Sequence, residues 1–258
     1  MSELNRIAVL VPALNEVLRI REVVTGALAH CPNVIVVDDG SSDGTLQQIA
    51  ELPVTVIAHD ERRGKGESLR DGFRAALARG CEGVLTMDGD GQHSAEDIPR
   101  LLAAARAFPG HIVIGARLIE RERQPAVRRA ANDFADWGIG WACGQRLLDT
   151  QSGQRYYPRA AMALVEIATE GFVFESEILI EASRRLGMRV VAVPIRSRYQ
   201  GEFRRSHFRP VRDFCRIAGR VIYRIARARF AWKDYRRSRR QAPLLFDPET
   251  PHAQGAAP

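Results

Sequence analysis

The sequence predicts an α/β fold in which a mostly parallel sheet is flanked by helices on both faces. Two observations support this. Short apolar runs rich in β-branched residues alternate with helical patterns through the first half of the chain, and these runs are apolar throughout instead of alternating with polar residues. Strands of that kind are typical of parallel sheets covered by helices. The chain has 258 residues, 45% of them hydrophobic, which suffices for one such domain with an appendage.

The first half of the chain contains four predicted strands, at residues 7–11, 34–37, 54–58 and 83–87. Apolar residues at helical spacing predict helices between them, at residues 15–29, 45–52 and 69–79. In a sheet of this kind, ligands bind beyond the carboxyl ends of the strands. Polar residues follow three of those ends, so we expect a binding site there.

The second half is less regular. We expect helices at residues 97–108, 126–144 and 174–186, and strands at 111–115 and 189–195. The chain then divides into a main domain over residues 1–210, a basic helical segment over 211–240, and a tail over 241–258. The tail is rich in Pro and Ala, a composition that predicts disorder.

The positive charge of the chain is concentrated near its C-terminus. Residues 196–240 contain 16 Arg and Lys residues against three Asp and Glu residues, whereas the remainder is net acidic. Four arginines recur at every fourth residue and form one stripe of an amphipathic helix: Arg212, Arg216, Arg220 and Arg224. Such a helix can lie on an anionic membrane surface, or pack its apolar side on the main domain. A nucleic-acid arm is the least favoured alternative, because no nucleic-acid module accompanies it.

Cysteine spacing and hydropathy indicate in which cellular compartment the protein is expected. The four cysteines are scattered without a paired motif, which argues against a zinc site or a disulfide framework and favours a reducing compartment. No run reaches the ~18 apolar residues of a membrane-spanning helix. The short N-terminal apolar run predicts a strand and not a signal peptide. We therefore expect a cytoplasmic protein, either soluble or peripheral on the inner face of the membrane.

Two acidic motifs follow predicted strands. Asp38 and Asp39 come directly after the second strand, where they can cap the next helix or accept hydrogen bonds from a nucleotide base. Asp88 and Asp90 follow the fourth strand with glycine between them. A bare Asp-x-Asp is usually a solvated turn, but two carboxylates at a ligand-binding edge suit Mg²⁺ or Mn²⁺ shared with phosphate oxygens. His93 is expected to be a turn histidine, with a place near the metal as the alternative.

Residues 62–66, Arg-Arg-Gly-Lys-Gly, lie between the third strand and a helix. Glycine N–H groups and cationic side chains are typical of loops that hold phosphate. The full P-loop pattern is missing, so a basic surface turn is an equal alternative.

Taken in order, these motifs resemble one enzyme family. Residues 11–16 (VPALNE), 36–45 (VVDDGSSDGT), 63–66 (RGKG) and 87–93 (MDGDGQH) resemble the inverting family-2 glycosyltransferases with a GT-A fold. Residues 149–155 (DTQSGQR), 174–177 (FESE) and 193–195 (VPI) resemble the branch of polyprenyl-phosphate mannose and glucose synthases. The resemblance covers roughly residues 6–210. It implies a Rossmann-like GT-A domain, a nucleotide-sugar donor, Mg²⁺ or Mn²⁺, and a lipid-linked acceptor, with no nucleic acid.

The resemblance also implies roles for individual residues. Donor binding would involve Pro12, Asn15, Glu16, Asp38, Asp39, Arg63, Lys65, Asp88, Gly89, Gln92 and Arg198. The metal would be held by Asp88, Asp90 and Gln92. The acceptor phosphate would meet Arg117, Arg128, Arg129 and Ser152. Catalytic roles would fall to Asp149, Asp90 and Glu177.

The acceptor is less constrained than the donor, because two departures from the family pattern affect it. Gln154 replaces an aromatic residue, and the loop at residues 198–207 is longer and more basic than in the family. An ionised acceptor phosphate needs no general base, whereas a lipid or glycan hydroxyl needs one. For a hydroxyl acceptor the candidate base is Asp149 with Glu177 behind it, although Glu175 or Glu177 can instead belong to a solvated helix face. A rival from another class is a non-catalytic protein that binds anionic membrane or nucleic acid through residues 196–240.

Overall fold

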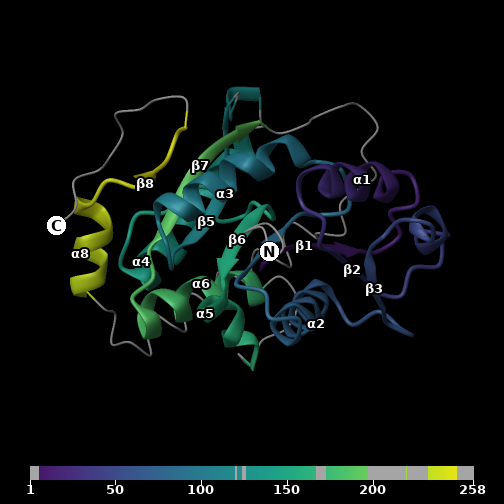
Figure 1. Ribbon diagram of the computed structural model, residues 1–258. Coiled ribbons are helices and arrows are strands. Elements are labelled where there is room, and N and C mark those ends of the chain that lie inside the picture. The colour runs from purple at the N-terminus through teal and green to yellow at the C-terminus, as the bar shows by residue number, and fades with distance from the viewer. Residues whose placement is uncertain are drawn as a thin grey trace.

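The computed structural model describes residues 6–119, 121–123, 126–166, 173–196, 219 and 232–248. Within these residues the strands form one sheet in the order β3-β2-β1-β4-β6-β5-β7-β8. The strands are β1 (Ile7–Ala13), β2 (Val34–Asp38), β3 (Thr55–Ala58), β4 (Gly83–Thr86), β5 (Ile112–Ile119), β6 (Arg155–Pro158), β7 (Val190–Arg196) and β8 (Leu244–Leu245). Helices cover both faces of the sheet (Figure 1). The predicted α/β fold is confirmed.

The α-helices are α1 (Ile20–His30), α2 (Lys65–Ala78), α3 (Ile98–Ala107), α4 (Ala126–Cys143), α5 (Arg159–Met162), α6 (Val173–Leu186) and α8 (Trp232–Arg240). Short 3₁₀ helices are η2 (Leu46–Ile49), η3 (Ala95–Asp97), η4 (Arg121–Arg123) and η5 (Ala163–Glu166). None of the described helices combines the length and the apolar character that crossing a bilayer requires.

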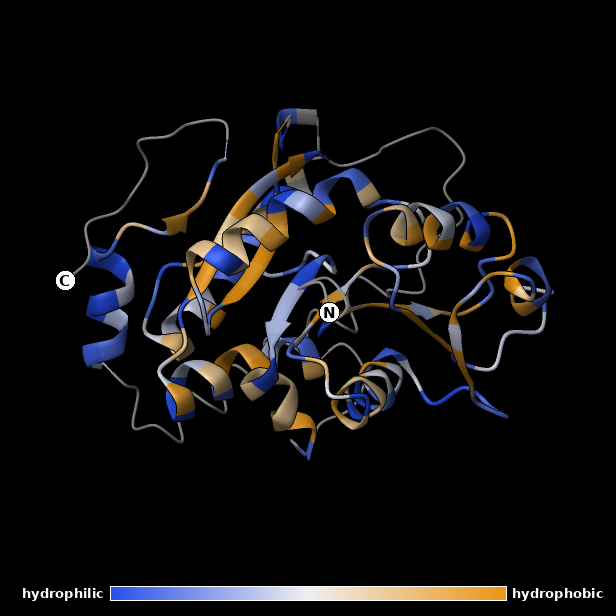
Figure 2. Ribbon diagram, viewed as in Figure 1, coloured by the Kyte–Doolittle hydropathy of each residue, from blue (hydrophilic) through white to orange (hydrophobic). Residues whose placement is uncertain are grey.

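The sheet separates two apolar cores. On one face, Phe73 of α2 and Phe174 of α6 pack against strand residues such as Leu10. On the other face, Ile20 of α1 and Ile98 of α3 pack against a second set of strand residues. Because both faces of each central strand are buried, the strands carry apolar residues at consecutive positions, as their colouring in Figure 2 shows.

Strand β6 is the one antiparallel member of the described sheet. It pairs in antiparallel fashion with both β4 and β5, while every other described pair is parallel. Strand β6 therefore begins at the edge where β1, β2, β4 and β5 end. As a consequence, the residues that precede Arg155 reach the same edge of the sheet as the acidic loops after β2 and β4.

Two predicted helices differ in extent from the observed ones. The helix expected at residues 15–29 begins only at Ile20, because Asn15 has a positive φ of 57° and side chains of the loop after β2 bind the backbone N–H groups of residues 15–17. The helix expected at residues 45–52 is reduced to the 3₁₀ turn η2. Pro53 follows closely, and the residue before a proline disfavours the α conformation.

The prediction of a disordered tail from residue 241 is wrong for its first part. Residues 244–245 form β8, which pairs with β7, and the ring of Phe246 lies 6.0 Å from that of Phe108, edge to face. Backbone hydrogen bonds hold the segment although its composition is that of a loop. Residues 249–258 lie outside the described residues. So does most of the predicted basic helix at 211–240, of which the structure describes residue 219 and α8.

Candidate active site

The loop after β1 is held by the side chains of the loop after β2. The backbone N–H of Asn15 donates to the Ser41 hydroxyl at 2.8 Å, and that of Glu16 donates to the Thr45 hydroxyl at 2.8 Å. In return the Asn15 side-chain oxygen accepts from the N–H of Ser42 at 2.9 Å. These reciprocal bonds stabilise the left-handed backbone at Asn15, and they fix Pro12, Asn15 and Glu16 beside the end of β2.

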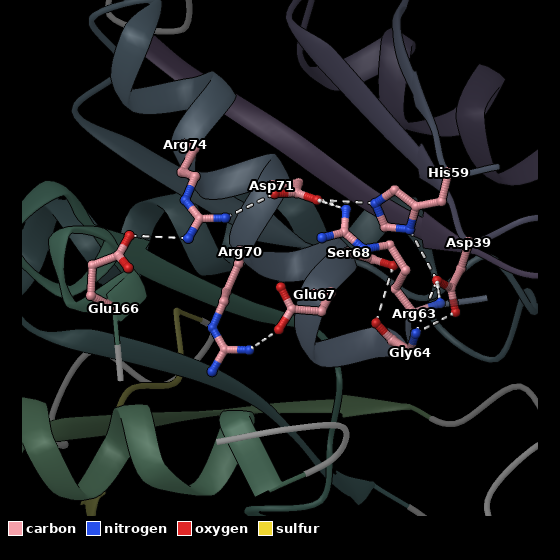
Figure 3. A network of polar contacts seen from close by, with 10 residues as sticks. All are labelled: Asp39, His59, Arg63, Gly64, Glu67, Ser68, Arg70, Asp71, Arg74 and Glu166. Carbon is pink, nitrogen blue, oxygen red and sulfur yellow. Dashed lines mark hydrogen bonds and ion pairs between the residues drawn. The ribbon is translucent and has the colours of Figure 1, made fainter. Parts of the chain in front are cut away.

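Asp38 and Asp39 are buried, and both already accept hydrogen bonds within the protein. Asp38 accepts from the Ser41 N–H at 3.0 Å. Asp39 accepts from the N–H groups of Arg63 and Gly64, at 2.7 Å and 2.9–3.0 Å, and lies 3.0 Å from a ring nitrogen of His59 (Figure 3). Asp38 and Asp39 therefore organise the surrounding loops. This role is wider than the alternative, in which they only cap the next helix. Asp39 in particular fixes the loop that contains Arg63.

The Asp88-Gly89-Asp90 motif packs against the end of β1. A Cβ atom on Gly89 would lie 3.3 Å from the carbonyl oxygen of Pro12, so a side chain there would crowd the two loops. The Asp90 carboxylate accepts from the Gln92 N–H at 2.9 Å. Burial, together with the nearby charge of Asp88, raises the pKa of Asp90 to about 6. The rise indicates two carboxylates that repel each other in a partly dry site.

A partly buried chain of alternating charges extends from Asp88. Lys65, the first residue of α2, has its Nζ atom 2.7 Å from Asp88 and 3.3 Å from Glu175 of α6. Glu175 lies 3.8 Å from Arg155. Burial alone would lower the pKa of Lys65, but the two carboxylates outweigh it and raise that pKa. For Asp88, Lys65 likewise outweighs burial and lowers the pKa. Asp88 is therefore ionised.

The donor set fits a divalent cation that is shared with a ligand. Over the described ranges, no group of three or more His, Cys, Asp and Glu side chains is arranged to hold a metal by itself. Asp88 and Asp90 alone supply two hard carboxylates at one loop. Mg²⁺ usually takes one or two protein carboxylates and completes its shell with water and substrate phosphates. The observed pair suits that arrangement and does not suit a closed structural site.

His93 and Gly153 both lie next to the Asp88 carboxylate. The His93 ring lies 3.8 Å from the Asp88 carboxylate, and burial lowers the His93 pKa to about 4, so the ring is neutral. His93 thus lies in the turn after the motif, as expected, but it is buried beside Asp88, as the alternative of a place near the metal requires. A Cβ atom on Gly153 would lie 2.2 Å from an Asp88 carboxylate oxygen. The turn before β6 therefore packs directly against Asp88, a predicted metal ligand.

Arg117 and Asp149 bind each other. Asp149 accepts from the backbone N–H, Nε and Nη2 of Arg117, at 2.7 Å, 2.8 Å and 2.7 Å. Burial would raise the Asp149 pKa, but these bonds outweigh it and lower that pKa. Asp149 also has a positive φ of 49°, and its N–H donates to Asp136 of α4 at 2.7 Å. Thr150 donates to the same carboxylate through its N–H and its hydroxyl, each at 2.7 Å.

The other residues expected to contact the acceptor lie in different environments. Ser152 and Glu177 are both fully buried, so neither exposes a polar group to a bound acceptor, and the expected direct roles do not fit. The alternative of a solvated face for Glu175 or Glu177 is also wrong, because both lie in the interior. Arg129 donates to the carbonyl oxygen of Glu122 at 2.8 Å. Arg198 and the side chain of Arg128 lie outside the described residues.

Sequence reasoning missed Arg155, Asp136 and His59. Arg155 is 1% exposed and donates to the carbonyl oxygens of Ser152 and Thr150, both at 2.7 Å, which fixes the turn before β6. Its signal was its position next to the Ser-Gly motif. Asp136 and His59 carry no local signal, because their partners are distant in the chain.

The chain is similar in sequence to a known protein family. A model of glycosyl transferase family 2 matches residues 8–170. An undecaprenyl-phosphate mannosyltransferase of Micrococcus luteus is 32% identical over 213 residues, which cover 74% of this chain and 82% of that protein. A UDP-N-acetylglucosamine–dolichyl-phosphate N-acetylglucosaminyltransferase of Methanococcus voltae is 28% identical over 219 residues, 75% of this chain and 86% of that protein.

A solved structure supports the same fold. Glucosyl-3-phosphoglycerate synthase of Mycobacterium tuberculosis, crystallised with Mn²⁺, UDP and its product, matches with a TM-score of 0.63 and 23% identity. The match covers 86% of this chain and 80% of that one. With the family match over more than half of the chain and the acidic loops gathered at one edge of the sheet, this chain belongs to glycosyl transferase family 2 and is a glycosyltransferase.

Proposed function

We propose that this chain transfers a hexose, with inversion, from a nucleotide-sugar to a polyprenyl phosphate, with Mg²⁺ or Mn²⁺ at Asp88 and Asp90. Relatives that act on undecaprenyl phosphate and dolichyl phosphate support the acceptor. Their matches extend over most of both chains. The donor base and sugar are left open.

The Arg117–Asp149 pair carries the acceptor part of the proposal. A hydroxyl acceptor needs a general base within reach, and an efficient base has a pKa near the working pH. Asp149 has a lowered pKa and accepts three hydrogen bonds from Arg117, so it is a weak proton acceptor. An ionised phosphate is already a nucleophile. The pair thus favours a phosphate over a hydroxyl, and Asp149 orients Arg117 instead of removing a proton.

The acidic loop carries the donor part. Asp88 and Asp90 would hold the cation, and Gln92 would complete the loop around it. When bound, the cation neutralises the charge that develops on the departing nucleotide diphosphate. Lys65 lies 2.7 Å from Asp88 and would supply a second positive charge to the diphosphate. Pro12, Asn15, Glu16 and Asp39 frame the proposed nucleotide side.

The acceptor test compares two lipids that differ in one group. The purified chain is incubated with Mn²⁺ and radiolabelled GDP-mannose or UDP-glucose, with either a short polyprenyl phosphate or the matching polyprenol. We expect label to enter the organic phase with the phosphate alone. Label on the polyprenol would support the hydroxyl alternative and overturn the phosphate assignment.

We also propose that α8 places the enzyme on an anionic membrane. Trp232, the first residue of α8, is 59% exposed, and five exposed cations follow it along the helix: Lys233, Arg236, Arg237, Arg239 and Arg240. The Trp232 ring lies 5.7 Å from that of Trp141 in α4, and Trp137 of α4 is also exposed. Aromatic rings beside clustered cations suit the headgroup layer of an anionic bilayer.

Flotation with vesicles tests the membrane proposal separately from catalysis. Wild type is expected to float with vesicles that contain phosphatidylglycerol and to remain behind with pure phosphatidylcholine. A variant with Arg236, Arg237, Arg239 and Arg240 changed to Gln is expected to lose most of this binding, while its folding and its transfer to a detergent-dissolved acceptor persist. Equal flotation of the variant and wild type would remove α8 from the proposal.

A further inference from the structure

His59 lies between two carboxylates on the donor side of the fold. It follows β3, and its Nδ1 atom is 3.0 Å from Asp39 while its Nε2 atom is 3.0 Å from Asp71 of α2 (Figure 3). The His59 side chain is 3% exposed and that of Asp39 is 5% exposed. The contact with Asp39 therefore forms in the interior, where solvent screens it weakly, whereas the Asp71 side chain is 20% exposed.

An imidazole ring carries a hydrogen-bonding nitrogen on each side. In His59 each of these nitrogens lies 3.0 Å from a different carboxylate. The ring therefore connects the end of β2 with α2.

The charged groups around His59 come from three elements. Asp39 faces it from the end of β2 and Asp71 faces it from α2. Arg63, from the intervening loop, lies 3.3 Å from the same Asp71 oxygen, and Arg74 of α2 binds the other Asp71 oxygen at 2.9 Å. The two arginines share Asp71, and Arg63 also binds Asp39 through its backbone N–H, so His59 and Arg63 together connect Asp71 to Asp39.

Asp39 connects His59 to the loop of the proposed diphosphate site. Its carboxylate binds the N–H groups of Arg63 and Gly64, and Gly64 has a positive φ of 97°. The next residue, Lys65, begins α2 and pairs with Asp88. If the Asp39 carboxylate moved, these hydrogen bonds would be lost and the loop that positions Lys65 would be released.

We infer that His59 is a positioning residue whose ring ties Asp39 to Asp71 and so helps to hold the Arg63–Lys65 loop in its nucleotide-binding form. The inference rests on the proposed donor site. It predicts that removing one of the two ring contacts weakens nucleotide binding by about tenfold, because hydrogen bonds to charged groups are strong.

Calorimetry with UDP and with GDP, each with Mn²⁺, tests this. His59→Gln, which donates to only one carboxylate, should bind nucleotide about tenfold more weakly than wild type while its melting temperature stays close to that of wild type. Arg74→Gln is the matched control, since it alters the Asp71 surroundings and leaves both His59 contacts in place; it should bind as wild type does. If His59→Gln binds nucleotide as tightly as wild type, the inference fails.

A second measurement separates this inference from the proposed function. Hydrogen exchange of the Gly64 amide, without any nucleotide, should be faster in His59→Gln and in Asp71→Asn than in wild type. If neither nucleotide binds wild type but exchange changes as expected, the donor assignment fails and the role of His59 stands. Unchanged Gly64 exchange in both folded variants would overturn the role of His59.

Discussion

At the scale of single residues, Asp88 is held by more than its own loop. Lys65 pairs with it, His93 lies beside it, and Gly153 approaches it so closely that a methyl group would lie 2.2 Å from a carboxylate oxygen. The position of the carboxylate is thus set from three parts of the chain. Such surrounding contacts typically change metal affinity by about 10- to 100-fold when they are altered.

Gly153→Ala should therefore displace the Asp88 carboxylate. The carboxylate is the end of a side chain and can rotate away, so we expect little loss of stability but Mn²⁺ binding weaker by about tenfold, measured by electron paramagnetic resonance with UDP present. Gly219→Ala is the matched change, because a Cβ there would meet no atom of the described residues within 4 Å. Equal Mn²⁺ affinity in the two variants would contradict the proposed metal position.

Asp90→Asn should abolish transfer and stabilise the fold at neutral pH. The Asp90 pKa is raised to about 6, so its stabilising contribution is present in acid and is lost as pH rises through 6. At pH 7.5 the variant removes a repulsive charge and should gain about 2 kcal/mol in free energy of unfolding. At pH 4 this gain should vanish. Thermal unfolding at both pH values checks the sign, and normal turnover would refute the metal role.

At the scale of elements, β8 extends the sheet at its far end. It pairs with β7, the N–H of Phe246 donates to Ala192 at 2.9 Å, and Asp247 lies 3.4 Å from Arg100 of α3. The segment covers an edge that would otherwise present unpaired backbone groups of β7. Exposed edges of this kind favour association with other chains.

Deletion of residues 242–258 should lower stability by about 2 kcal/mol, which for a chain of this size corresponds to roughly 4–8 °C in melting temperature. The deleted chain should also aggregate more readily. Deletion of residues 249–258 alone is the control, because it keeps every described contact of β8. Matching melting curves for the two truncations would show that β8 does not stabilise the sheet.

The sequence predicted those elements whose pattern is local. The buried strands β1, β2, β4 and β7 stand out as continuous apolar runs between turn residues, and the acidic motifs follow two of them. Strand β6 was not predicted, because its Arg-Tyr-Tyr-Pro sequence has no apolar run and its partners are distant. Strand β8 has two residues in a segment of loop composition. Both strands form because they hydrogen-bond to strands that are distant in the sequence.

The candidate site divides in the same way. Asp88, Asp90 and Lys65 were found from motifs, and the structure brings them together. The mutual pairing of Arg117 and Asp149 was not foreseen, since each was assigned a separate partner. The burial of Ser152 and Glu177 was not foreseen either, because exposure depends on how α6 packs. Distances between groups remote in sequence cannot be read from spacing.

At the scale of the whole molecule, the proposed metal and donor should stabilise the fold together. Because the diphosphate is proposed to bind together with a cation at Asp88 and Asp90, UDP or GDP should raise the melting temperature strongly only with Mn²⁺. A ligand at 100 times its dissociation constant adds about 2.7 kcal/mol. Differential scanning fluorimetry across nucleotides, with and without EDTA, would identify the base. Equal shifts with EDTA present would argue against a shared metal.

The antiparallel strand in the middle of the sheet has a consequence for how the enzyme folds. The Thr86 hydroxyl donates to the Gly153 carbonyl oxygen at 2.8 Å, a contact between positions 67 apart in the chain. Closing so long a loop is slow and entropically costly. During refolding, the helices and the first parallel strands should thus form before the turn that contains Gly153 packs against Asp88. Nucleotide binding should therefore return after most of the circular dichroism signal has recovered.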